Sequence, residues 1–149
     1  MLKMELIVND FSDYSDIFSL WSIVYVKIGD FCFPDDQWWD STSDILYMWI
    51  EGIYRLVSGC TDCCVLDFMD GDFAIKLTSK NQCEAAAICT RPYGTVAFNG
   101  NVDLLHFARQ LLSAVEKMKM QYTDYYDSRV IQRLITEANK LRTIIKMRR

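Results

Sequence analysis

A β-hairpin in the middle of the chain is the strongest structural signal in this sequence. The segment Met69-Asp70-Gly71-Asp72 separates two apolar-rich runs. An Asp-Gly pair in such a setting is typical of a two-residue type I′ turn, in which both central residues have positive φ. Further turn signals occur at Lys80-Asn81 and at Arg91-Pro92-Tyr93-Gly94. The centre of the chain is therefore predicted to form a four-stranded antiparallel meander, with strands at 63–68, 73–78, 82–90 and 94–99.

Apolar residues at helical spacing predict three helices around this meander. The first begins after Ser41-Thr-Ser-Asp44, which combines a hydroxyl cap with an acid three residues later, and it ends at Ser58-Gly59. Runs of β-branched and aromatic residues near the N-terminus predict two further strands. The predicted helices cover 42–58, 102–121 and 126–147, the further strands cover 2–8 and 20–28, and a loop is expected at 9–19.

These elements predict one α+β domain that spans residues 1–149. A chain of 149 residues is long enough to bury roughly two thirds of its unfolded surface. Each helix has an apolar stripe that must pack against something, and one face of the sheet is the available surface. We expect an antiparallel sheet of about six strands in the order ββ-α-ββββ-αα, with the helices packed mainly on one face.

The N-terminal sequence bears on the cellular compartment. The first residues, MLKMELIVND, contain no long apolar run and no small-residue cleavage site, so a secretory signal is not expected. No stretch approaches the roughly 18 uncharged apolar residues of a transmembrane helix. The sequence therefore favours a soluble cytoplasmic protein, in which cysteines stay reduced.

Six cysteines are present, and Cys60-Thr-Asp-Cys63 has the spacing of a zinc or redox pair. A zinc site would need a second pair, but Cys83 and Cys89 on one strand would lie about 20 Å apart. A thioredoxin-like pair opens a helix after a strand, whereas this one follows a helix. Buried, unreactive thiols explain the cysteines better. No metal or other cofactor is expected, although a metal at Cys60 and Cys63 stays open.

Familiar catalytic motifs are absent from the sequence. There is no nucleophile elbow, phosphate-binding loop or H-E-x-x-H zinc motif. The single histidine, His106, lies in a predicted helix near Asp103 and is interpreted as structural, because a general base also needs an orienting acid and a nucleophile. A hydrolase remains an alternative, in which carboxylates converge with or without a metal. Its candidate residues are Asp35, Asp36, Asp40 and Asp70.

Charge is distributed very unequally between the two halves of the chain. Residues 1–75 hold 14 acidic and 3 basic side chains, whereas residues 76–149 hold 6 acidic and 13 basic ones. The basic residues include a cluster at the C-terminal end of the last predicted helix. Helix dipoles and solvated surfaces could account for this pattern without any function. The overall acidity argues against nucleic-acid binding, so a nucleic-acid or membrane contact of the basic helix is disfavoured.

A second interpretation of the charges is a binding loop for a basic protein. The acids of residues 30–44 surround two adjacent tryptophans. An exposed tryptophan offers a large anchoring area, and carboxylates steer a cationic partner and speed association. Two adjacent residues rarely point the same way, so one tryptophan is expected to face the core. The predicted partner-binding residues are Asp35, Asp36, Trp38, Trp39, Asp40 and Asp44. Self-association of the acidic half with the basic half of a second copy is a further possibility.

Three short motifs carry a family resemblance. They are Phe33-Pro34 with Trp38 and Asp40, Trp49 in an apolar helix, and Phe68-Met69-Asp70-Gly71. Together they resemble a group of small bacterial proteins, some encoded beside polymorphic toxins as immunity proteins. The resemblance implies a cytoplasmic protein that has no enzymatic activity and that binds and blocks a cognate toxin. It implies no catalytic residues. We therefore expect an interaction module that covers a basic cleft on its partner.

Overall fold

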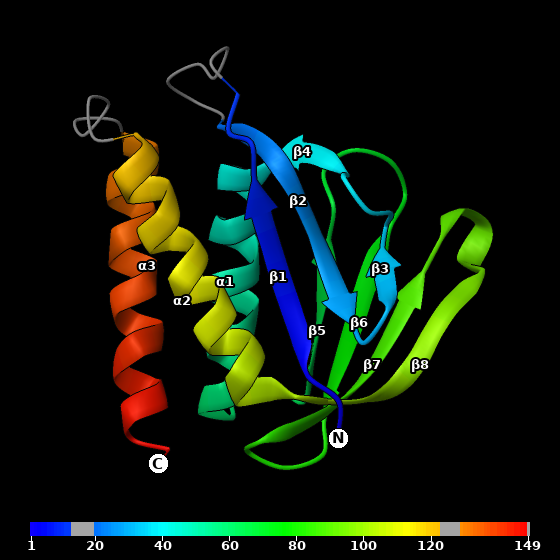
Figure 1. The fold of residues 1–149 in the computed structure, drawn as a ribbon. Coiled ribbons are helices and arrows are strands. Elements are labelled where there is room, and N and C mark those ends of the chain that lie inside the picture. Colours follow the sequence, from blue (N-terminus) through cyan, green and yellow to red (C-terminus); the bar gives the residue numbers. More distant parts are fainter. Residues whose placement is uncertain (13–19, 123–128, 149) are drawn as a thin grey trace.

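The computed structural model describes residues 1–12, 20–122 and 129–148. In this part of the chain the fold is α+β, with three α-helices and two antiparallel four-stranded sheets (Figure 1). The first sheet contains β1 (Met4–Asn9), β2 (Trp21–Ile28), β3 (Phe31–Phe33) and β4 (Trp39–Ser41). The second contains β5 (Cys63–Asp67), β6 (Ala74–Ser79), β7 (Glu84–Thr90) and β8 (Val96–Asp103). The helices are α1 (Thr42–Ser58), α2 (Leu104–Gln121) and α3 (Arg129–Lys146).

The α+β class, the helix at 42–58 and the four-stranded meander are thus confirmed. The expected single sheet is two sheets among the described residues, because β1 to β4 pair only with one another and β5 to β8 likewise. The short strands β3 and β4 add to those expected near the N-terminus. Both new strands pair with β2, β3 at its end and β4 at its start. Residues 13–19 of the predicted loop and 126–128 of the last predicted helix lie outside the described residues.

The connection between β5 and β6 differs from the predicted two-residue turn. The backbone N–H of Phe68 donates to the carbonyl of Phe73 over 3.1 Å, which leaves a four-residue loop at 69–72. Gly71 has a φ of 78°, but Asp70 is not among the residues with positive φ. A type I′ turn needs positive φ at both positions, so that part of the prediction is wrong.

Aromatic side chains join the two sheets across the core. Phe31 of β3 stacks on Phe98 of β8, with 5.7 Å between ring centroids. Phe33 meets Phe68 at 5.8 Å and Phe73 at 5.9 Å, both edge to face. Edge-to-face and offset contacts are the favourable geometries for aromatic pairs. The short strand β3 therefore acts as the apolar contact between the first sheet and the meander.

The three helices lie together on one side of the two sheets, with α3 outermost (Figure 1). Helix α1 packs against β5 and β2, α2 packs against β1, and α3 covers both helices. Helix α1 buries its apolar stripe and ends at Ser58. Its C-cap is Gly59, whose φ of 84° is the left-handed conformation that glycine adopts easily. No helix in the described ranges is long and apolar enough to span a bilayer.

The N-terminus also connects the sheets. Leu2 forms an isolated parallel bridge with Val102 near the end of β8. The Leu2 N–H donates to the Asn101 carbonyl over 2.9 Å, and the Asp103 N–H donates to the Leu2 carbonyl over 2.8 Å. Leu2, two residues before the start of β1, is therefore bonded to the last strand of the second sheet.

Candidate functional site

The acidic and aromatic segment that runs from β3 to α1 divides into an internal and an external part. Asp40 is fully buried, although the sequence placed it on the binding surface. Its Oδ2 accepts hydrogen bonds from the backbone N–H groups of Met69 and Asp70 and from the Trp38 indole, each over 3.1 Å. Its Oδ1 accepts the Ser41 N–H over 2.7 Å. A buried carboxylate needs such compensation. Asp40 therefore fixes the loop at 69–72 to β4 and is not part of an exposed surface.

Trp38 belongs to the same internal part. Its ring lies edge to face against Phe73, with 5.1 Å between centroids, and its indole N–H is bound by Asp40. The side chain is half-buried at the margin of the core. Trp38 was predicted as a candidate anchor for a partner, and the structure instead makes it a contact between the two sheets. Of the two adjacent tryptophans, Trp39 is the exposed one, at 46%.

Asp35, Asp36 and Trp39 form the external part of the segment. Both aspartates are exposed in the turn after β3, where the Asp36 N–H donates to Asp35 Oδ1 over 3.0 Å. Asp44 is also exposed, but it lies on the helical side of the segment. It accepts a hydrogen bond from the Ser41 hydroxyl and borders a small hollow that Arg133 of α3 also lines. The structure therefore does not group Asp44 with Asp35 and Asp36.

A second exposed tryptophan, which the sequence did not single out, completes this surface. In the β2–β4 ladder, Trp21 is opposite Ser41 and Ile23 is opposite Trp39. Directly paired residues and their neighbours two positions along share one face of a sheet. Trp21 and Trp39 therefore lie on the same outer face, diagonal to each other, and Trp21 is 39% exposed. We call Trp21, Asp35, Asp36 and Trp39 the acidic–aromatic surface.

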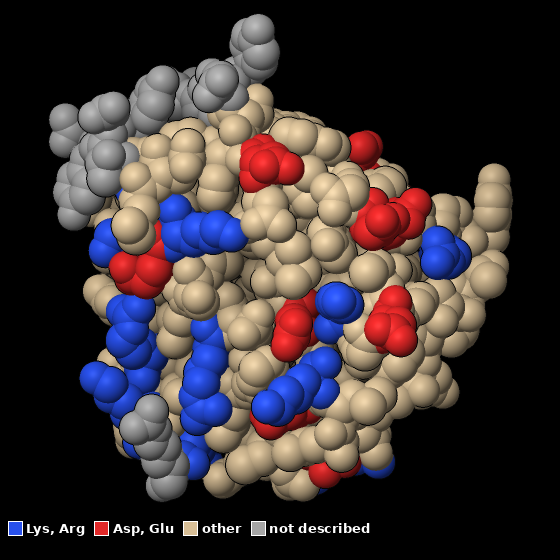
Figure 2. All heavy atoms as spheres, in the orientation of Figure 1, with Lys and Arg blue, Asp and Glu red and all other residues tan. Residues whose placement is uncertain are grey.

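The charge division of the sequence is also visible in space. Figure 2 shows most of the Lys and Arg side chains of this face over α2 and α3, and most Asp and Glu side chains over the strands. Charged groups of one sign on one side of a protein create a field that orients an approaching partner. The acidic–aromatic surface belongs to the sheet side, which is the acidic one.

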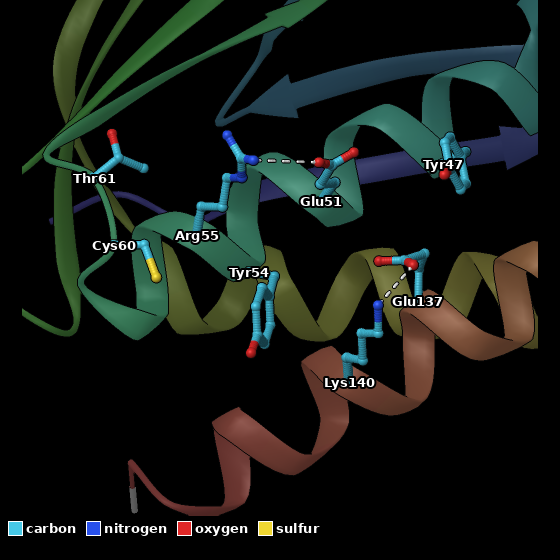
Figure 3. A pocket seen from close by; sticks show the side chains of 8 residues that line it. All are labelled: Tyr47, Glu51, Tyr54, Arg55, Cys60, Thr61, Glu137 and Lys140. Carbon is cyan, nitrogen blue, oxygen red and sulfur yellow. Dashed lines mark hydrogen bonds and ion pairs between the residues drawn. The ribbon is translucent and has the colours of Figure 1, made fainter.

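A cavity of about 500 Å³ lies between α1 and α3 (Figure 3). Inside it, Glu51 pairs with Arg55 over 3.7 Å and Glu137 pairs with Lys140 over 3.1 Å. The two carboxylates and two cations balance each other, so the cavity wall carries no excess charge. Its lining residues are Tyr47, Glu51, Tyr54, Arg55, Cys60, Thr61, Glu137 and Lys140. None of the predicted binding residues lines it.

Sequence reasoning missed this cavity, although a signal existed. Tyr47, Glu51 and Tyr54 are spaced four and three residues apart, which places them on one face of α1. From the sequence alone, this face is predicted to be the solvated side of an amphipathic helix. The packing of α3 against α1 turns the solvated face into one wall of a hollow.

The carboxylates of the alternative hydrolase do not form an open cluster. Asp40 is buried and bound by four donors, whereas Asp35, Asp36 and Asp70 are exposed. Among the residues that the structure describes, no group of three or more His, Cys, Asp or Glu side chains is placed to hold a metal ion. Asp40 approaches Asp70 only through the Asp70 backbone N–H, which is a structural contact.

The region of His106 has a structural role. Asp103 caps α2, because its Oδ1 accepts the backbone N–H of His106 over 2.9 Å. This is the bond by which an N-cap aspartate satisfies a free helical donor. The His106 imidazole Nε2 is buried without a hydrogen-bond partner among the described residues. The prediction that His106 is structural fits this placement at the start of α2.

The cysteines correct the prediction of buried thiols. Cys60, Cys63 and Cys83 are exposed, Cys32 and Cys64 are half-buried and Cys89 is buried. Burial, with a smaller contribution from the nearby Cys63, raises the pKa of the Cys64 thiol to about 12. Burial also raises the pKa of Cys89 to about 12, against the opposing effect of Arg91. Cys60 in the turn after α1 and Cys63 at the start of β5 are both in solvent, which the sequence could not show.

This division predicts the order in which the thiols react. At pH 8, iodoacetamide is expected to modify Cys60, Cys63 and Cys83 rapidly, and Cys64 and Cys89 at least about tenfold more slowly, because only thiolates attack. Peptide mass spectrometry over time measures the five rates, and the same reaction in urea is the control. Equal rates for all five thiols in the folded protein would contradict the described burial.

The described residues form two candidate sites: the exposed acidic–aromatic surface on the first sheet and the charge-balanced cavity between α1 and α3. Comparison with protein-family models, with curated proteins and with solved structures finds no match for this chain.

Proposed function

We propose that this protein is a small cytoplasmic interaction module that binds a basic protein partner through the acidic–aromatic surface. One observation carries the proposal. Two tryptophans, 39% and 46% exposed, share one outer face of the first sheet, and the exposed Asp35 and Asp36 precede one of them in the chain. Large exposed aromatic side chains serve as anchors in protein interfaces. The immunity-type inhibitor expected from the sequence resemblance is the specific form of this proposal.

The mechanism is occlusion of a cationic cleft. The two indoles bury apolar area against the partner, and the two carboxylates pair with lysine or arginine side chains at its rim. Anchors buried at the centre of an interface control dissociation, whereas rim charges mainly set the association rate. No bond is made or broken on this protein. Inhibition follows because the partner's cleft cannot admit its substrate while the surface covers it.

The Trp39 side chain gives the sharpest test of the anchor. Trp39→Ala is expected to weaken partner binding about 30-fold, or about 2 kcal/mol, because a central anchor is removed. The partner is first captured from the native host on the immobilised protein, and the affinity of the isolated pair is then measured by calorimetry. Met120→Ala is the control, since Met120 is an exposed apolar residue of α2, outside the acidic–aromatic surface.

The carboxylates are tested separately from the anchor. The double variant Asp35→Asn/Asp36→Asn is expected to slow association and to weaken its salt dependence, with little change in the dissociation rate. Asp62→Asn, an exposed acid outside the surface, is the control. If both the Trp39→Ala and the Trp21→Ala proteins bind the captured partner as tightly as the unchanged protein, the proposed surface is the wrong one.

A further inference from the structure

The turn between β7 and β8 holds an aromatic side chain in an unfavourable backbone conformation. The Gly94 N–H donates to the Arg91 carbonyl over 3.2 Å, so Pro92 and Tyr93 are the two central residues of the turn. Tyr93 has a φ of 64°, in the left-handed region that glycine or asparagine usually occupies at this position of a turn. A bulky side chain raises the free energy of that conformation. Position 93 would therefore suit a smaller residue better.

The fold gains nothing from the Tyr93 side chain that would offset this cost. Tyr93 is 101% exposed, the highest value among the large apolar and aromatic side chains of the described residues. A side chain this exposed packs against no other part of the chain, so its ring adds no stability. Backbone strain that packing does not explain is typical of binding and active sites. The Tyr93 ring therefore indicates a function outside the fold.

The turn lies next to the part of the acidic–aromatic surface that contains Asp35. Arg91, at the start of the turn, donates from Nη1 to the Pro34 carbonyl over 3.4 Å, and its guanidinium lies 6.0 Å from the centroid of the Phe33 ring. Asp35 directly follows Pro34. Figure 1 shows the turn as the outer end of the β7–β8 hairpin, and Figure 2 shows this end projecting from the surface. The two turns are therefore neighbours, although they belong to different sheets.

The acidic turn contains a second residue with an unfavourable backbone conformation. Gln37, which follows Asp36, is exposed and has a φ of 59°. Only three non-glycine residues of the described chain have a positive φ, and two of them, Gln37 and Tyr93, lie in these neighbouring turns. Residues with strained backbones cluster where proteins bind their partners. The pattern indicates that the two turns are parts of one contact surface.

We propose that Tyr93 is an anchor that enters an apolar pocket on the basic partner, beside the cleft that the acidic–aromatic surface covers. This inference rests on the proposed function, because it assigns a further contact to the same partner. Residues 92–102 carry no charge, so the tip of the hairpin does not select the cationic rim of the cleft. Val96, which is 56% exposed, adds apolar area near the ring. A tyrosine ring buries a large apolar area while its hydroxyl binds a polar group at the end of the pocket.

The turn is rigid enough to present the ring for insertion. The Arg91 N–H donates to the Thr95 carbonyl over 2.8 Å, so a second backbone hydrogen bond closes the turn below the first. Pro92 has a fixed φ. An aromatic side chain on a rigid turn loses little conformational entropy when it binds. Loss of the ring is therefore expected to increase mainly the dissociation rate.

Tyr93→Asn tests both steps of the argument, because asparagine tolerates a positive φ and lacks the ring. It is expected to raise the thermal unfolding temperature of the isolated protein by about 2 °C. It is also expected to weaken binding of the captured and isolated partner about 30-fold, as measured by calorimetry. Tyr93→Phe keeps the ring and should weaken binding about fivefold or less. Met120→Asn, the same replacement at an exposed residue of α2, should leave the affinity unchanged.

Tyrosine iodination followed by peptide mass spectrometry checks the contact directly, since Tyr93 should be labelled in the free protein and protected in the complex. If Trp39→Ala weakens binding but Tyr93→Asn does not, the inference is overturned and the proposed function stands. If Tyr93→Asn weakens binding but neither Trp39→Ala nor Trp21→Ala does, the proposed surface is wrong and the inference that extends it falls with it. A lower unfolding temperature for Tyr93→Asn would show that Tyr93 stabilises the fold, and would also overturn the inference.

Discussion

Replacing Asp40 by alanine is expected to lower the free energy of unfolding by about 3 kcal/mol or more. The substitution leaves three buried or half-buried backbone N–H groups and the Trp38 indole without their acceptor. An unsatisfied buried donor costs about 1–3 kcal/mol, and losses within one network are not additive. Urea denaturation followed by circular dichroism measures the change.

Two further variants serve as comparisons for Asp40→Ala. Asp35→Ala removes an exposed acid of the same segment and should change stability by no more than about 0.5 kcal/mol. Asp40→Asn keeps one acceptor oxygen but turns an amide group toward the remaining donors, so we expect a loss nearly as large as that of Asp40→Ala. An Asp40→Ala protein as stable as the Asp35→Ala protein would show that the carboxylate does not hold the loop at 69–72.

Trp49→Ala is expected to lower the free energy of unfolding by about 3–5 kcal/mol, the range for removing a large aromatic side chain from a core. Trp49 is fully buried at the centre of α1. Its ring lies edge to face against Phe68 at 5.0 Å and contacts Phe107 of α2 at 6.2 Å. The substitution therefore removes the contact at which α1, α2 and the meander meet.

Trp49→Phe separates packing from hydrogen bonding at this position. It retains an aromatic ring but leaves the Asp67 carbonyl without the indole donor, so a smaller loss of about 1–2 kcal/mol is expected. Trp39→Ala removes an exposed tryptophan and should change stability little. A Trp49→Ala loss no larger than that of Trp39→Ala would contradict the central position of Trp49. Thermal and urea unfolding measure all three proteins.

Much of the fold could be predicted because its elements are long and regular. Helix α1 has strong start and stop signals, and its apolar spacing fixes both the buried face and the ends. The strands of the meander are separated by clear turn residues. The short strands β3 and β4 could not be found in this way, because three residues carry no periodicity. They form because both can hydrogen-bond to the same side of β2. This pairing depends on residues outside the short strands themselves.

The candidate site was only partly predictable, for a related reason. The sequence places Asp40 among other acids, and nothing local distinguishes a carboxylate that binds the distant loop at 69–72 from one in solvent. Trp21 was missed because its position beside Trp39 exists only in the register of β2 and β4. Cys60 and Cys63 were predicted to be buried, because nothing in the neighbouring sequence indicates that the end of α1 and the start of β5 are exposed. Asp35, Asp36 and Trp39 are exposed, and their role in binding stays a prediction.

The bridge between Leu2 and Val102 has a consequence for the order of folding. The two residues are separated by almost the whole of both sheets along the chain. Closing so long a loop is entropically costly, and such contacts form late when local ones are available. During synthesis, β1 can pair with β2 early. Leu2 can bind β8 only after β8 has left the ribosome. We therefore expect Leu2, although it is made before both sheets, to be among the last residues to reach its native contacts.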